Sequence, residues 1–241
     1  MISKAQIKFI KSLQIKKFRS EHKKFIVQGK KNVLELLMSD YQVHQLYATE
    51  SFLPDLESTK FQAEIISQNE LEKISSFQSN STALAIVEMP QNDYIEVNND
   101  WAIVLDQVKD PGNLGTIIRI ADWYGIKKII CSLDCVDAYN PKVISASMGS
   151  FCRVHVFYTE LNSYLKKQKE AIFGALLDGE SIYKTKQIKT GYLLMGSESQ
   201  GISSDLKKYI TNKVSIPRIG EAESLNVAVA TGIICDNLLR K

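Results

Sequence analysis

Hydrophobic and polar positions alternate in two different ways along the chain, with a change near residue 92. In the first part, short apolar runs predict strands, and apolar residues spaced three or four apart predict helices. The expected strands cover residues 25–27, 43–47, 63–66 and 83–87. The expected helices cover residues 3–14, 32–37 and 69–74. This pattern predicts a small α/β domain over residues 1–92.

A polar stretch rich in Asn and Asp follows at residues 93–100, and we interpret it as a linker. Beyond it, strands and helices alternate over residues 101–241. The expected strands are 101–105, 128–131, 154–157, 172–177, 192–195 and 213–216. The expected helices are 113–124, 140–149, 160–169, 203–209 and 224–239. Such alternation predicts an α/β fold with a mostly parallel sheet that helices cover on both faces.

The composition indicates a soluble globular protein: 44% of the 241 residues are hydrophobic and 24% are charged. No apolar run approaches the roughly 20 residues that span a bilayer, and the N-terminus has no apolar signal core. We therefore expect a cytoplasmic protein without a membrane partner. The four cysteines include Cys131 and Cys135, but no second pair or nearby His completes a metal site, so we expect no metal.

Positive charge is concentrated at the N-terminus. Residues 1–31 contain ten Lys or Arg and a single acid, Glu21, whereas the rest of the chain carries a net charge of −6. A basic segment on a mildly acidic body suggests a polyanionic partner, because neutralised phosphates release counterions. A solvated amphipathic helix would explain the same charges.

The first segment with candidate chemistry is 110–119, which follows a strand and opens a helix. Asn113 is a good N-cap, and the N-terminus of a helix attracts phosphate or an oxyanion. Arg119 lies two turns along, where its guanidinium could bind phosphate or ribose. A capped helix with a surface arginine would show the same pattern. A dinucleotide-binding fold lacks support, because the G-x-G-x-x-G spacing is absent.

Two later segments complete the set. Residues 194–202 place Gly196, Glu198 and Gly201 just after a predicted strand, where ligands of parallel sheets bind. Residues 216–230 contain Ser224, interpreted as an N-cap, and Asn226 in the first turn of the last helix. An ordinary strand-to-helix loop and a C-terminal core helix are the plain alternatives.

These three segments, in this order, resemble the conserved blocks of the SpoU (TrmH-type) branch of the SPOUT RNA methyltransferases. The first is centred on Asn113 and Arg119, the second on Gly196, Glu198 and Gly201, and the third runs from Ile216 to Val227. The resemblance covers residues 101–241 well. More loosely, Lys17-Phe18-Arg19 and residues 25–29 resemble the family's ribosomal-protein-like substrate-binding domain.

The resemblance implies a deep trefoil knot in the C-terminal sheet, a homodimer, and S-adenosylmethionine as cofactor. The residues that it implies for cofactor binding are Leu194, Gly196, Gly201, Ile216, Pro217, Ser224 and Leu225. The catalytic candidates are Arg119, Asn113, Glu198, Ser224 and Asn226. Arg119 and Asn113 would reach toward the partner subunit's cofactor site. Since free arginine stays protonated, we expect Arg119 to act as a cation near the reacting oxygen.

Three positions depart from the family pattern: Ser197 and Gln28 replace Asn and Glu, and Ser145 stands where a number of relatives are basic. None breaks the three segments. The expected function is S-adenosylmethionine-dependent 2′-O-methylation of ribose in structured RNA, with 23S ribosomal RNA favoured over tRNA. The alternatives are a tRNA methyltransferase, a non-catalytic knotted RNA-binding protein and, from another class, an NAD-type dehydrogenase.

Overall fold

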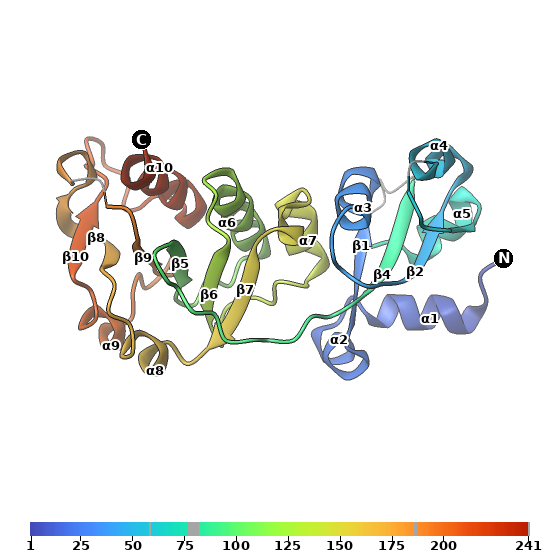
Figure 1. The fold of residues 1–241 in the computed structure, drawn as a ribbon, viewed down its shortest axis with the longest axis horizontal. Coiled ribbons are helices and arrows are strands. Elements are labelled where there is room, and N and C mark those ends of the chain that lie inside the picture. The colour runs from blue at the N-terminus through green and yellow to red at the C-terminus, as the bar shows by residue number, and fades with distance from the viewer. Residues whose placement is uncertain (58, 77–81, 186–187, 241) are drawn as a thin grey trace. The chain divides into compact units, whose positions relative to one another are not determined.

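The computed structural model describes residues 1–57, 59–76, 82–185 and 188–240, and these form two compact units (Figure 1). The first unit consists of residues 1–91 together with residues 137–152. The second begins at Asn92, runs to Val136, and resumes at Arg153. A segment from the middle of the chain thus belongs to the N-terminal unit. No helix among the described residues is long and apolar enough to cross a membrane.

The first unit contains a four-stranded sheet in the order β1-β4-β2-β3. Its strands are β1 (Lys24–Gln28), β2 (Val43–Ala48), β3 (Glu64–Ile65) and β4 (Ala83–Glu88). Strand β4 pairs antiparallel with β1 and β2, and β2 pairs parallel with β3. The helices are α1 (Lys4–Ser12), α2 (Lys16–His22), α3 (Lys30–Leu37), α4 (Leu53–Leu56), α5 (Gln68–Ile74) and α7 (Pro141–Ser147). The 3-10 turns are η1 (Glu50–Phe52) and η2 (Ser150–Cys152).

Capping and burial explain why α1 and α5 form where the sequence predicts them. Ser3 and Ser67 each open a helix with a capping box, in which the serine and the third helical residue satisfy each other's backbone N–H groups. The apolar side of α1, with Ile10 and Leu13, then packs into a core that includes Leu71 of α5. Removing such side chains from water is the main force that holds the helices to the sheet.

Helix α2 was not predicted, because its sequence is charged and has no apolar period. A buried arginine holds it instead: the Arg19 side chain is only 2% exposed, and its guanidinium lies 2.6 Å from Asp137. Arg19 also donates a hydrogen bond of 2.9 Å to the carbonyl of Leu13. A charge is tolerated at this depth only when it is paired and hydrogen-bonded, which both contacts provide.

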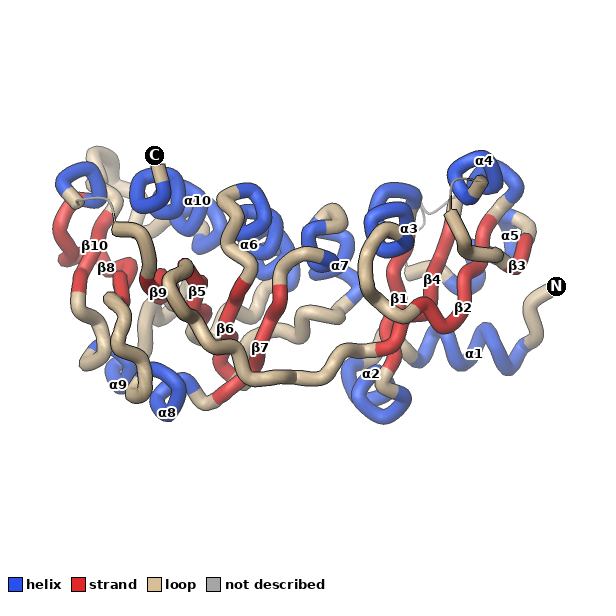
Figure 2. The backbone as a smooth tube through the Cα atoms, in the orientation of Figure 1, coloured by secondary structure: helices blue, strands red, loops and turns tan. Residues whose placement is uncertain are grey.

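The second unit contains a six-stranded sheet in the order β10-β8-β9-β5-β6-β7 (Figure 2). Every neighbouring pair in it is parallel. Its strands are β5 (Trp101–Leu105), β6 (Lys128–Ser132), β7 (His155–Thr159), β8 (Ile172–Ser181), β9 (Gly191–Met195) and β10 (Asn212–Ser215). The helices are α6 (Pro111–Trp123), α8 (Leu161–Leu165), α9 (Ser204–Lys207) and α10 (Val227–Leu239), with the 3-10 turn η3 (Ile182–Lys184). The predicted α/β class and parallel sheet are confirmed, and the trefoil knot stays a prediction.

Both faces of this sheet are covered. Figure 1 shows α6 and α10 on one side and α8 and α9 on the other. On the α8 and α9 side, a buried cluster joins Val104 and Leu194 of the central strands to Tyr164 and Leu206 of the helices. Every residue of β5 and β9 is buried, which is why both strands appear in the sequence as unbroken apolar runs.

Residues 93–100, expected to form a linker, pack against the second unit. Ile95 and Val97 are 4% and 1% exposed and belong to the same buried cluster as Leu194. The Tyr164 hydroxyl donates a hydrogen bond of 2.8 Å to the carbonyl of Ile95. Of the polar residues, only Glu96 lies between these two anchors and the others flank them, so the polar composition of the stretch conceals the packing.

Candidate active site

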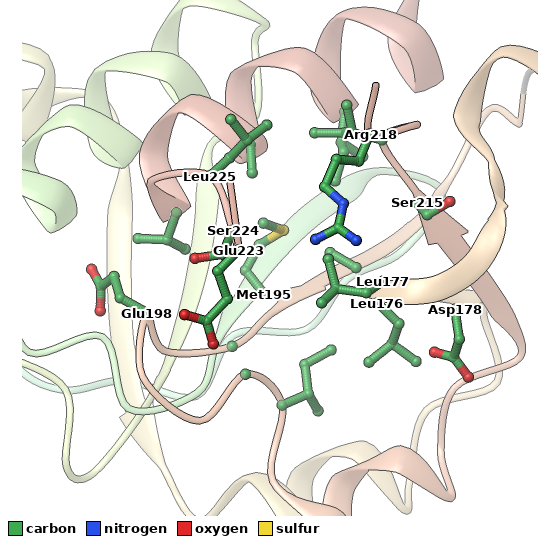
Figure 3. Close-up of a pocket in the computed structure, with 18 of the residues that line it drawn as sticks. Leu176, Leu177, Asp178, Met195, Glu198, Ser215, Arg218, Glu223, Ser224 and Leu225 are labelled. Carbon is green, nitrogen blue, oxygen red and sulfur yellow. The ribbon is translucent and has the colours of Figure 1, made fainter. Parts of the chain in front are cut away.

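A cavity of about 660 Å³ lies in the second unit beside the carboxyl ends of β8, β9 and β10 (Figure 3). The carboxyl edge of a parallel sheet is where ligands of α/β proteins usually bind. Two irregular segments form much of the wall: residues 195–202 after β9 and residues 214–225 at and after the end of β10. The apolar part of the lining includes Leu176, Leu177, Met195, Ile202, Val214 and Ile216. A cavity of this size and character suits a drug-sized ligand with a flat apolar portion.

The loop after β9 is closed on itself at its base. Ser197 and Gly201 exchange two backbone hydrogen bonds of 2.9 and 3.2 Å. A methyl group added to Gly196 would overlap the backbone of Gly201 and Ile202, so only glycine fits there. Gly201 itself has a φ of +64°, a conformation that glycine adopts without strain. The two glycines therefore hold the loop in a tight turn that presents its backbone to the cavity.

Helix α10 begins at Val227, three residues after its predicted start, with Asn226 rather than Ser224 as its N-cap. The Asn226 side chain accepts hydrogen bonds from the backbone N–H groups of Ala228 and Val229. The prediction of Ser224 as the cap was wrong because two capping residues stand close together and only the second is followed by helical backbone. Ser224 instead lies in the cavity lining.

Helix α6, in contrast, begins at Pro111, two residues before its predicted start. Its N-cap is Asp110, whose carboxylate accepts a hydrogen bond of 2.8 Å from the backbone N–H of Asn113, and Pro111 stands in the first turn. Proline fits there because that turn has no intrahelical partner for its N–H. The prediction of Asn113 as the cap was therefore wrong, and its side chain is free for another use.

That use is a hydrogen-bonded chain of three side chains from all three segments. The Asn113 amide donates to the carboxylate of Glu198, and the Asn226 amide donates to the Asn113 carbonyl oxygen at 2.8 Å. Each Asn has both a donor and an acceptor, so one amide can bridge a carboxylate and a second amide. The structure thus brings together three of the five predicted catalytic residues. We call them the Asn–Glu–Asn chain after their order in the sequence; Asn113 is the middle member of the hydrogen-bonded chain.

Arg119 is placed differently. It lies on the exposed side of α6 with Thr116 and Trp123, three and four residues away. Within the part of the chain that the structure describes, its guanidinium makes no hydrogen bond or ion pair, and it does not line the cavity. Trp123 is 83% exposed, which is unusual for so large an apolar side chain.

The comparison with known proteins identifies the family and the fold. The SpoU rRNA Methylase family matches residues 100–236, more than half of the chain. The chain belongs to this family. A second match, to the MRM3-like substrate binding domain, covers residues 4–85. The predicted membership of the SpoU family is confirmed.

Relatives of this SpoU family member match along almost the whole chain. The 23S rRNA (guanosine(2553)-2'-O)-methyltransferase RlmP of Bacillus subtilis strain 168 is 30% identical over 238 residues, which are 97% of this chain and 95% of RlmP. A solved structure of a putative TrmH-family RNA methyltransferase from Porphyromonas gingivalis has 35% identity and a TM-score of 0.89, and covers 100% of this chain and 99% of that one. An AdoMet-bound rRNA methyltransferase from Sinorhizobium meliloti has 25% identity and a TM-score of 0.88, with 100% and 97% covered.

Within this SpoU fold, most of the residues expected to bind cofactor line the cavity. They are Gly196, Gly201, Ile216, Pro217, Ser224 and Leu225. Leu194 does not line it, because its side chain is fully buried on the α8 and α9 side of the sheet. Four charged lining residues escaped the sequence analysis: Asp178, Lys207, Arg218 and Glu223. For Arg218 and Glu223 the position between Pro217 and Ser224 was the available signal, but no pattern distinguishes them from solvated loop charges.

Proposed function

We propose that this chain transfers a methyl group from S-adenosylmethionine to a ribose 2′-hydroxyl of 23S ribosomal RNA. The full-length similarity to RlmP, whose name states this reaction on a guanosine of 23S rRNA, carries the proposal. The SpoU match over residues 100–236 supports the chemistry. The MRM3-like match over residues 4–85 supports a substrate-binding role for the N-terminal domain, and the ten basic side chains of residues 1–31 suit an RNA partner. In functional terms we divide the chain into residues 1–92, a linker at 93–100, and residues 101–241.

The residues of the cavity fit S-adenosylmethionine. The apolar wall suits an adenine ring, and the tight turn at Gly196 and Gly201 leaves backbone groups available for hydrogen bonds to a nucleoside. We assign cofactor binding to the predicted residues that line the cavity. Leu194 would contribute only indirectly, as a buried residue of β9 next to Met195, which lines the cavity. When bound, the cofactor supplies a methyl group that is already strongly electrophilic, so the protein mainly has to orient the two reactants.

The attacking 2′-hydroxyl must lose its proton as its oxygen gains the methyl group. No His or Cys stands among the described residues that line the cavity, so the side chain that most often acts as a general base is not at hand. We assign to Arg119 the stabilisation of the negative charge that develops on the oxygen, since its guanidinium stays protonated, and the orientation of an RNA phosphate that accepts the proton. The Asn–Glu–Asn chain would hold the loops that form the cavity, and Ser224 would help to position the ribose or the cofactor.

A homodimer would explain the placement of Arg119. The side chain projects from α6 into solvent beside the exposed Trp123, so it is available to a second copy of the chain. Leu225 and Val229, at 48% and 52% exposure, add apolar surface near the start of α10. Burying such side chains favours association. In this arrangement Arg119 of one subunit would serve the cavity of its partner, and the trefoil knot would bring the cavity-forming loops together.

Methyl transfer to RNA tests the activity. Purified protein, labelled S-adenosylmethionine and 23S rRNA lacking the modification should give label in dinucleotides that resist alkaline cleavage, because a 2′-O-methyl group blocks that cleavage. Label in tRNA instead would indicate the tRNA alternative. Tight RNA binding with no transfer to either RNA would indicate a non-catalytic RNA-binding protein and contradict the proposal. Cys131, Cys135 and Cys235 form no disulfide among the described residues, which suits action in the reducing cytoplasm.

Subunit complementation tests the dimer. An Arg119→Ala variant is mixed with a Gly196→Val variant, whose cavity loop cannot close. If each arginine serves the partner's cavity, mixed dimers contain one complete site and regain activity, although both parents are inactive. A mixture that stays inactive after subunit exchange is demonstrated would contradict the arrangement.

A further inference from the structure

Two side chains of opposite charge line the cavity without a matching counter-ion. Arg218 donates one hydrogen bond of 3.3 Å to the carbonyl of Ala222, and it makes no ion pair with any described residue. Glu223 also lines the cavity, and no hydrogen bond or ion pair to it is found within the described ranges. Both belong to the segment between β10 and α10, five residues apart.

The other acids of the lining already have partners. Asp178 lies 3.3 Å from the Lys213 ammonium, and Glu198 accepts from Asn113 in the Asn–Glu–Asn chain. Lys207, on α9, is the other cation of the lining. Arg218 and Glu223 therefore stand out as an opposite pair that the protein leaves available at the cavity.

Figure 3 shows how the two side chains lie. The Arg218 guanidinium points inward above Leu176 and Leu177, while the Glu223 carboxylate points inward near Met195. A ligand placed between them would meet a planar donor fork on one side and a carboxylate acceptor on the other. A guanidinium group such as that of Arg218 can donate two parallel hydrogen bonds to a carboxylate of the ligand. A carboxylate such as that of Glu223 can accept a hydrogen bond from an ammonium group of the ligand.

We propose that Arg218 and Glu223 recognise the zwitterionic α-amino-acid end of the cofactor, with Arg218 on its carboxylate and Glu223 on its ammonium group. The inference rests on the proposed function, because it takes S-adenosylmethionine as the ligand. It adds a division of the cavity into an apolar nucleoside part and a charged amino-acid part. The two residues are specificity determinants: they select ligands that carry the amino-acid end over nucleosides that lack it.

Binding measurements with three ligands test the assignment without relying on catalysis. S-adenosylhomocysteine carries both charges, decarboxylated S-adenosylmethionine keeps only the ammonium group, and 5′-methylthioadenosine has neither. Dissociation constants are measured by calorimetry for the full-length protein and for the Arg218→Gln, Glu223→Gln and Lys207→Gln variants. Lys207→Gln is the matched control, since it removes a cation from the same cavity.

Arg218→Gln should weaken S-adenosylhomocysteine about tenfold and leave the other two ligands within about twofold. Glu223→Gln should weaken both ligands that carry the ammonium group, and leave 5′-methylthioadenosine unchanged. Lys207→Gln should change none of them by more than about twofold. Undiminished binding of 5′-methylthioadenosine also shows that each variant is folded.

Other binding results would contradict individual parts of the assignment of Arg218 and Glu223. Equal weakening of all three ligands by Arg218→Gln would mean that the arginine only shapes the cavity. A selective loss in Lys207→Gln instead would move the carboxylate contact to α9. If Glu223→Gln weakened decarboxylated S-adenosylmethionine but not S-adenosylhomocysteine, the glutamate would respond to the sulfonium and not to the ammonium group. If the wild-type protein bound none of the three ligands, that result would contradict the proposed function itself.

Discussion

Asn113 and Arg119 stand two turns apart on the same helix, yet their surroundings are opposite. Asn113 is fixed at both ends of its amide, by Glu198 and by Asn226. Arg119 is exposed and makes no hydrogen bond or ion pair with any residue that the structure describes. A side chain that its own chain holds on two sides is suited to positioning. One that its own chain leaves free is suited to a substrate or a second subunit.

The largest expected effect is therefore on catalysis, at Arg119. An Arg119→Ala variant should lower the rate of methyl transfer about 100- to 1,000-fold, since it removes a preorganised charge from the reacting oxygen. Its free energy of unfolding should stay within about 0.5 kcal/mol of wild type, because the side chain is exposed and makes no hydrogen bond or ion pair with any described residue. Single-turnover transfer and urea unfolding measure the two quantities. A normal rate with normal cofactor binding would remove Arg119 from the site.

For the Asn–Glu–Asn chain, in contrast to Arg119, we expect substitutions to lower the free energy of unfolding. Asn113→Ala and Asn226→Ala should each destabilise the protein, and the double variant should lose less than the sum. We expect a coupling energy of about 1 kcal/mol, in the range found for contacting residues. A double-mutant cycle by urea unfolding measures it. Strict additivity would show that the hydrogen bond between the two amides contributes nothing.

Asn226 has two roles, and one substitution separates them. Asn226→Asp keeps an acceptor for the N–H groups of Ala228 and Val229, so α10 keeps its cap, but it cannot donate to Asn113. Asn226→Ala should cost about 1 kcal/mol more than Asn226→Asp, the usual value of an N-cap. Ser224→Ala is the control for the cap. It should leave the free energy of unfolding nearly unchanged, and a loss as large as that of Asn226→Ala would restore Ser224 as the cap.

The smallest effect is expected at a second arginine that contacts α6. Arg153 donates to both carboxylate oxygens of Asp122 at 2.9 to 3.1 Å, and its side chain is 47% exposed. Arg153→Gln should cost at most about 1 kcal/mol of stability, since exposed ion pairs contribute little. It should leave methyl transfer unchanged. A loss of transfer comparable to that of Arg119→Ala would mean that the charge of this surface, and not Arg119 itself, matters.

Strands were more predictable from the sequence than helix starts. All six strands of the second unit lie within a few residues of their predicted ranges. For β5 and β9 the reason is that strands buried on both faces are unbroken apolar runs. The starts of α6 and α10 were misplaced, because Asp110 and Asn113, and later Ser224 and Asn226, offer competing caps close together. Propensity cannot choose between such neighbours, whereas the packing of the folded chain does.

The site was predicted from the three sequence segments and not from contacts between individual residues. The three motifs pointed to the correct region, yet nothing in the spacing indicated that Asn113 would bond to residues 85 and 113 positions away. Arg218 and Glu223 were not predicted, because isolated charges in a loop have no period. Arg19 of α2 entered the prediction only within the segment Lys17-Phe18-Arg19, which resembles the family's substrate-binding domain. Its burial was not predicted, because it depends on Asp137, which is 118 residues distant.

The segment 137–152 has a consequence for the order of folding during synthesis. Its aspartate holds α2, and it belongs to the unit that residues 1–91 begin. That unit therefore stays incomplete until about 60 more residues have left the ribosome, roughly 3 to 12 seconds at ordinary elongation rates. Until then Arg19 lacks its carboxylate, and part of the N-terminal core has no cover. The first domain to be made is thus not the first that can finish folding, and β5, α6 and β6 must emerge before it does.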